Sequence, residues 1–221
     1  MKAPSTKARA DLGAATVPAT RLVITAGAWS GHVLSTLFPS ATVRPPISPL
    51  AGHSIVVRSP RWSAEHEQHG CHAVFATDSD GFSPEVFSRM GGEIYLAGLN
   101  DASIPLPKVA TDAEPDPAAI RRLEDVARRM LGLRSGEDDL EILREGLCFR
   151  PVTPRGLPII GRVPDAKLGG NFKTRGGGDG GVFFAAGHGP WGISNSLGTG
   201  KVMAQLIEGK PTSADIRRLS V

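Results

Sequence analysis

The segment Gly181–Gly209 constrains the fold most strongly, because an apolar run, a glycine loop and a helical pattern follow one another without a gap. Val182–Ala186 is an apolar run of strand length. Gly187–Gly192 is a tight loop, and the apolar positions from Ile193 onward have helical spacing that ends at Gly209. Such a loop presents unpaired backbone N–H groups at the positive end of a helix dipole. We therefore expect a site for an anion or a dipolar heterocycle.

Known phosphate-binding motifs fit this loop only in part. Gly187, Gly189 and Gly192 have the Gly-x-Gly-x-x-Gly spacing of a dinucleotide fold, in the expected strand–loop–helix context. The acidic residue that should end a second strand about 20 residues later has no counterpart here, so an NAD-type domain remains a disfavoured alternative. A P-loop is excluded because Lys201 is followed by Val202 rather than by Ser or Thr. A glycine turn without a ligand is the other alternative.

Composition narrows the class of protein. With 221 residues, of which 40% are hydrophobic, the chain is long enough for a substantial core. It has no apolar run of about 18 residues, so we expect no membrane-spanning helix. The formal net charge is +3, and the arginines of the helical segment 117–131 alternate with Glu124 and Asp125. This mixture indicates a solvated helix face rather than a nucleic-acid interface.

The two cysteines, Cys71 and Cys148, have neither metal-ligand nor redox-pair spacing. They indicate a reducing compartment in which a buried thiol behaves as a small apolar group. Neither a secretory nor a peroxisomal signal is visible, so the expected location is the cytoplasm. His66, His69 and His72 are spaced by three, but they lack helix signals, and we expect no metal site there.

The region before the proline cluster repeats the strand–glycine–helix pattern. Leu22–Ile24 is a continuous apolar run typical of a buried parallel strand, Gly27 ends it, and Ser30–Leu37 can form a short helix. Residues 1–20 have weak periodicity and are expected to form a disordered or frayed arm. Pro45, Pro46 and Pro49 then indicate a linker into a second lobe.

Short strands dominate the middle of the chain. We expect strands at Ser54–Arg58, Ala73–Thr77 and Glu93–Gly98 in an antiparallel sheet, with residues 78–90 as a connector. Asp116 is placed to cap an amphipathic helix from Pro117 to about Leu131. Another strand is expected within Leu140–Thr153.

Three stretches together carry a family resemblance: Val23–Ser30, Phe149–Gly161, and Phe184–Gly192 with Gly198–Lys201. In this order they resemble the D-amino-acid-oxidase-like family of FAD-dependent oxidoreductases, which includes glycine oxidase and sarcosine oxidase. The resemblance extends from about Arg21 to Lys210. It implies an α/β (α+β) fold in which an incomplete FAD/NAD(P)-binding Rossmann-like lobe joins a mixed, largely antiparallel substrate-lobe sheet.

The resemblance also implies a division of the chain. The expected segments are an arm, a first FAD-lobe segment, a substrate lobe, a return to the FAD lobe and a tail: 1–20, 21–44, 45–148, 149–210 and 211–221. Family members begin with a strand–Gly-x-Gly-x-x-Gly–helix unit, which residues 1–20 do not resemble. We therefore expect a truncated, C-terminal part of the fold with an open strand edge and an unfilled cofactor groove.

Residue roles follow from the resemblance. Those implied to contact FAD are Ala26, Gly27 and Trp29 near its phosphates, and Gly187, Gly189, Trp191, Gly192 and Ile193 around the flavin ring. Arg150 is implied to clamp a substrate carboxylate, for which a guanidinium fork is suited. His188 is implied to add a donor or a tunable charge beside the ring.

The implied reaction is oxidation of an amine or amino acid C–N bond, with hydride transfer to FAD and reoxidation by O₂. The substrate would be a small molecule, and no nucleic-acid partner is expected. The alternative is a non-catalytic remnant or interaction module on the same fold, favoured by the missing phosphate-binding unit.

Overall fold

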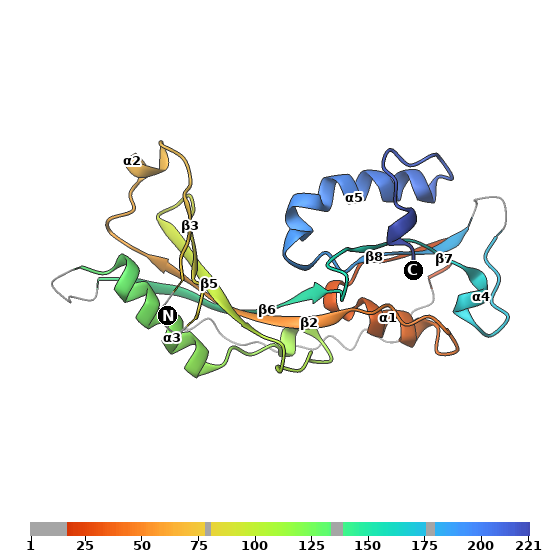
Figure 1. Cartoon of the computed structure of the whole chain (residues 1–221), viewed down its shortest axis with the longest axis horizontal. Coiled ribbons are helices and arrows are strands. Elements are labelled where there is room, and N and C mark those ends of the chain that lie inside the picture. Colours follow the sequence, from red (N-terminus) through yellow and green to blue (C-terminus); the bar gives the residue numbers. More distant parts are fainter. Residues whose placement is uncertain (1–16, 78–80, 134–138, 176–179) are drawn as a thin grey trace.

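The computed structural model describes residues 17–77, 81–133, 139–175 and 180–221, which form an elongated molecule with a sheet toward each end (Figure 1). Residues 1–16 of the expected arm and 78–80 of the expected connector lie outside the described residues. Two long strands, β2 (Ser48–Arg58) and β6 (Glu141–Val152), extend between the ends of the molecule. Helices α1 and α3 lie on one side of the sheets, and α5 lies on the other (Figure 1).

The smaller sheet contains β1 (Arg21–Ile24), β8 (Gly181–Ala186) and β7 (Ile159–Val163) in the order β1-β8-β7. β1 is parallel to β8, and β7 is antiparallel to it. All six residues of β8 are buried, because each face of the strand packs against a separate core. Phe184 packs with the α1 side and Phe183 with the α5 side, as expected from alternation along a strand.

Two strand–loop–helix units lie side by side in this sheet. β1 continues through the 3₁₀ turn η1 (Gly27–Trp29) into α1 (Ser30–Leu37), and β8 continues through η3 (Gly189–Trp191) into α5 (Gly192–Ile207). These expected strands and helices are confirmed. The expectation that the first strand is buried is wrong, because among the described residues β1 has a strand partner on one side only and Val23 is 41% exposed.

The larger sheet is antiparallel, with the order β3-β4-β5-β2-β6. Its remaining strands are β3 (Ala73–Phe75), β4 (Glu85–Ser88) and β5 (Glu93–Asp101). Helix α3 (Pro117–Leu131) covers one face and packs Leu123 and Val126 against Ile55 and Leu96. The Asp116 side chain accepts from the Ala118 N–H at 3.0 Å, so the predicted cap and helix are confirmed.

Two sequence expectations fail in the strands, and a third fails for the cysteines. β4 occupies part of the expected connector 78–90, since two neighbouring strands pair with a short, partly polar segment. β2 begins at Ser48, inside the expected proline linker, and Pro49 lies opposite Pro151 of β6. Cys71 and Cys148 are exposed, not buried.

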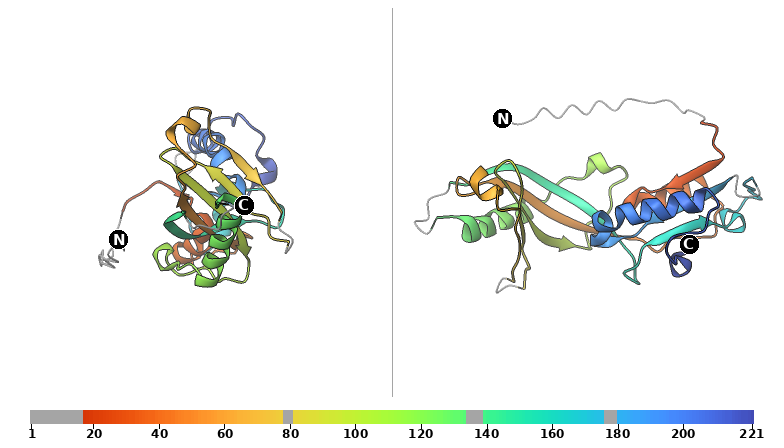
Figure 2. Two further views of the ribbon diagram at one scale, coloured as in Figure 1. Left: turned by 90° about the vertical axis from the view of Figure 1, so that its left-hand side faces the viewer. Right: turned by 90° about the horizontal axis from the view of Figure 1, so that it is seen from above.

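The other short elements are α2 (Ala64–Glu67), η2 (Ala110–Asp112), α4 (Asp165–Leu168) and η4 (Arg217–Leu219). A view from above shows α5 lying along the smaller sheet, with β2 and β6 leading away toward α3 (Figure 2). Within the described residues, no helix has the length and apolar character needed to cross a membrane.

Candidate functional site

The loops that follow β1 and β8 both begin at the carboxyl ends of these two parallel strands, at the same end of the smaller sheet. The parallel register places Ile24 opposite Phe184, so η1 and η3 begin at the same end of adjacent strands. Gly27 and Gly189 both have φ of 56°, in the left-handed region that favours glycine. A Cβ atom placed on Gly27 would meet nothing within 4 Å, and one on Gly189 would lie 3.8 Å from Val152 Cγ1. A flat ligand therefore has room to approach the backbone at both loops.

Gly187 has a different role from these two glycines. Its φ is 84°, and a Cβ atom placed there would lie 2.7 Å from Thr153 Cγ2. The backbone at Gly187 is thus packed against the chain that follows β6. This contact fixes where the loop after β8 begins.

Both helices begin without a cap. No side-chain cap bond is present at α1 or α5, and the first turn of each, all within described residues, has no acidic residue. The Ser30 N–H already donates to the Gly27 carbonyl, so it is the remaining N–H groups of these first turns, together with the helix dipoles, that favour an anionic or dipolar ligand. The start of α5 is open to solvent, since Trp191 is 62% exposed and Ile193 is 93% exposed.

His188 is held between β8 and α5. Its Nε2 atom lies 3.0 Å from the hydroxyl oxygen of Thr199, in the middle of α5. The ring is half-buried, and this burial lowers the pKa of His188 below its usual value of 6.5. The imidazole is therefore mainly neutral near pH 7, with one nitrogen able to donate and the other to accept.

Trp29 and its neighbours connect the first loop to the larger sheet. The Trp29 indole N–H donates to the Pro107 carbonyl at 2.7 Å, and its ring meets Phe149 edge to face at 5.9 Å. Ala26, by contrast, is exposed. Ser30 Oγ is fully buried and is, within the described chain, the one buried side-chain oxygen or nitrogen without a hydrogen-bond partner.

Arg150 lies on β6 and reaches across β2. Its Nη1 donates to Asn100 Oδ1 at 2.5 Å, and a Cβ atom on Gly52 would lie 2.5 Å from the same Nη1. The absent side chain at Gly52 therefore provides the space that the guanidinium occupies. Asn100 is neutral, and among the described residues no carboxylate forms an ion pair with Arg150. Its positive charge remains available to an anion.

The geometry of β6 turns Arg150 toward the loop that follows β8. Val152 is the closest neighbour of a Cβ atom on Gly189, and Arg150 precedes Val152 by two residues on the same strand. Side chains two apart share one face of a strand, so Arg150 is on the face that meets η3. Gly52 and Thr199 lie in stretches that resemble the family, but their contacts with Arg150 and His188, like that of Asn100, could not be predicted because they join segments far apart in the chain.

Comparison with known proteins decides the family. Residues 4–206 match the family described as FAD dependent oxidoreductase, DAO. This chain belongs to that family. The expected resemblance and the expected fold class are therefore confirmed.

Individual DAO relatives are similar over most of this chain. The TDA3 protein of Saccharomyces cerevisiae is 28% identical over 208 residues, which cover 90% of this chain and 34% of that protein. A D-amino acid dehydrogenase of Paramagnetospirillum magneticum is 28% identical over 179 residues, covering 81% of this chain and 35% of its own. The chain thus spans about a third of these curated relatives.

A solved glycine oxidase from Geobacillus kaustophilus has the same fold over this region. Its TM-score is 0.64 at 23% identity, and the match covers 90% of this chain and 44% of that structure. The open backbone at Gly27 and Gly189 and the uncapped starts of α1 and α5 suit the electron-rich cofactor on which the DAO family depends. The role of each site residue stays a prediction.

Proposed function

We propose that this chain forms the flavin-ring and substrate side of an FAD-dependent oxidoreductase that oxidises an amine or amino acid C–N bond. One observation carries the proposal: the starts of α1 and α5 follow adjacent parallel strands at the same end, and the Arg150 face of β6 meets the loop that leads into α5. When bound, FAD supplies the hydride acceptor, and O₂ is the proposed final electron acceptor.

Separate sets of residues would contact the cofactor and the substrate. The Trp191 N–H already donates to the His188 carbonyl at 3.1 Å and Pro190 has no N–H, so the N–H groups of Gly189 and of the first turn of α5 would face the edge of the flavin ring where negative charge develops. His188, mainly neutral because of its lowered pKa, would donate or accept one hydrogen bond there. Ala26, Gly27 and Trp29 would lie near the phosphates of FAD.

Arg150 would orient the substrate. Its guanidinium is positioned by Asn100 and by the space above Gly52, and two of its nitrogens remain to bind a carboxylate. The names of the relatives, D-amino acid dehydrogenase and glycine oxidase, support a substrate that carries such a carboxylate. A small amino acid is therefore the proposed substrate class.

The test is FAD binding by the purified full chain, followed by flavin absorbance and calorimetric titration. Ile193→Asp would place a carboxylate in the first turn of α5, at a side chain that is 93% exposed, so the fold should persist. We expect at least a tenfold loss of FAD affinity. Leu197→Asp, one turn later and 88% exposed, is the matched control. Equal FAD affinity in both variants would contradict the proposed position of the ring.

A second candidate function is an interaction module on the same fold. It is favoured by the outer edge of β1, which has no strand partner in the described chain, and by the exposed apolar Ile193 and Leu197. A folded, colourless protein that ignores added FAD would support this alternative. Reduction of bound FAD by an amino acid would exclude it.

A further inference from the structure

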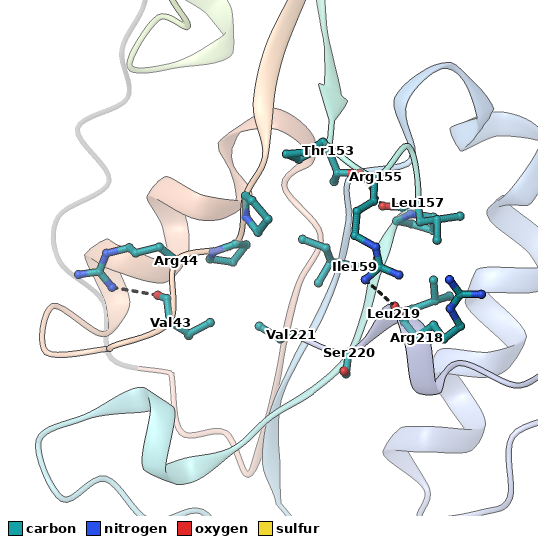
Figure 3. A pocket seen from close by; sticks show the side chains of 14 residues that line it. Val43, Arg44, Thr153, Arg155, Leu157, Ile159, Arg218, Leu219, Ser220 and Val221 are labelled. Atoms are coloured by element: carbon teal, nitrogen blue, oxygen red, sulfur yellow. Dashed lines mark hydrogen bonds between the residues drawn. The ribbon is translucent and has the colours of Figure 1, made fainter.

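A separate cavity of about 280 Å³ lies between three segments of the chain: 43–46, 153–159 and 218–221 (Figure 3). Its walls are mainly apolar. Pro45 and Pro46 contribute from one segment, Leu157 from the second and Leu219 from the third. Proline rings are rigid and carry no N–H donor, so they form a fixed apolar surface. The volume approaches the lower end, about 300 Å³, of typical small-molecule sites.

The rim of this cavity carries uncompensated positive charge. Arg155 Nη1 donates to the backbone carbonyl oxygen of Arg218 at 3.3 Å, which joins the segments 153–159 and 218–221 at one side of the cavity (Figure 3). In the part of the chain that the structure describes, neither guanidinium forms an ion pair with a carboxylate. An anion beside Arg155 would gain charge-assisted hydrogen bonds from its guanidinium.

Other polar groups of the lining are already engaged. Arg44 is directed away from the cavity, and its Nη1 donates to the carbonyl oxygen of Val43 at 3.0 Å (Figure 3). The Thr153 hydroxyl donates to the Leu157 carbonyl at 2.7 Å. A ligand would therefore find apolar walls and, at one side, the guanidinium of Arg155.

The cavity is distinct from the proposed flavin site. The backbone at Gly187 lies between them, because a Cβ atom there would meet Thr153 Cγ2 at 2.7 Å and the Ile159 nitrogen at 3.6 Å. Thr153 and Ile159 line the cavity, whereas Gly189 and Gly192 are not among its lining residues. Binding in the cavity does not require FAD.

We propose that this cavity binds a small organic carboxylate with an apolar or aromatic body. The body would lie between Pro45, Pro46 and the leucines, and the carboxylate would bind the guanidinium of Arg155. The inference is independent of the proposed catalytic function.

The test is calorimetric titration of the full chain with hydrocinnamate at low salt. Three probes separate the two elements of recognition: hydrocinnamate, its neutral amide hydrocinnamide, and acetate, which lacks the apolar body. We expect hydrocinnamide and acetate each to bind at least tenfold more weakly than hydrocinnamate. Equal binding of hydrocinnamate and its amide, or no binding of hydrocinnamate, would overturn the proposal.

Variants locate the site. Arg155→Gln should weaken hydrocinnamate at least tenfold, whereas Arg121→Gln, at an exposed position on α3, should leave it unchanged. Arg150→Gln should also leave the affinity for hydrocinnamate unchanged. A weaker affinity in this variant would assign the ligand to the proposed substrate site and refute binding in the cavity. Amide chemical shifts of Leu157 and Leu219 should change on titration of the wild-type chain. Unmoved shifts would refute the site without reliance on a variant's folding.

Discussion

The imidazole Nε2 of His188 lies 3.0 Å from the hydroxyl oxygen of Thr199, and this contact joins the loop after β8 to the middle of α5. The pairing matters because His188 directly precedes η3, whose backbone is proposed to face the flavin. A ring tied to α5 cannot rotate freely toward a ligand. Any change in its charge therefore acts on both the loop and the helix.

Stability should fall as the pH is lowered below about 6.5. Burial lowers the folded-state pKa of His188, and burial also lowers that of His53 despite the opposing effects of Asp116 and Asp101. Between each folded pKa and the unfolded value of 6.5, the unfolded chain binds more protons, so acid favours unfolding. Urea titrations across this pH window check the slope, and His188→Asn should reduce it. An equally steep slope in the variant would show that His188 does not contribute.

Gly52→Ala should disturb Arg150 without removing its charge. The new Cβ would lie 2.5 Å from Arg150 Nη1 and 3.1 Å from Asn100 Oδ1, so the guanidinium must move. In the FAD-loaded protein, we expect Arg150→Ala to raise KM for an amino acid about tenfold or more, with a smaller effect on kcat, and Gly52→Ala to raise KM less. Gly31→Ala is the control, because a Cβ there meets nothing within 4 Å. An unchanged KM in Arg150→Ala would remove this residue from substrate binding.

Gly187→Ala should destabilise the chain by about 1–3 kcal/mol, because φ of 84° disfavours alanine and the added Cβ overlaps Thr153 Cγ2. Thr153→Ser deletes that methyl group but keeps the hydroxyl that bonds to Leu157. In the double variant, we expect part of the lost stability to return. Chemical denaturation of the four proteins of the cycle measures this coupling. If the two changes in the free energy of unfolding simply add, the overlap between the new Cβ atom and Thr153 Cγ2 is relieved by movement of other atoms.

Ser30→Ala should leave the free energy of unfolding unchanged or raise it by about 1 kcal/mol. The Ser30 hydroxyl is buried without a hydrogen-bond partner, and an unsatisfied buried polar group is costly. Ser35→Ala is the control, since the Ser35 hydroxyl donates to the His32 carbonyl at 2.9 Å and the variant loses that bond. Thermal and urea unfolding compare the two variants. A marked loss of stability in Ser30→Ala would reveal a partner for this hydroxyl.

Sequence reasoning succeeded where the signal is local. Helix α3 follows from apolar periodicity, from the Asp116 cap and from Pro117 at the first position, all within one short segment. The units β1–α1 and β8–α5 follow from apolar runs that end in glycine. Strand β4 was missed because its pattern is weak, and its neighbours β3 and β5 determine its conformation.

The sequence by itself determined the strand–glycine–helix units, helix α3 and membership of the DAO family, since each depends on residues close together in the chain or on a motif read in order. Only the tertiary structure decided that Arg150 donates to Asn100 above Gly52, and that His188 contacts Thr199. It also decided that the apolar cavity lined by Thr153 and Ile159 forms beside Gly187. These contacts depend on sheet register and on side-chain packing between distant segments. Neither is encoded in the spacing of neighbouring residues.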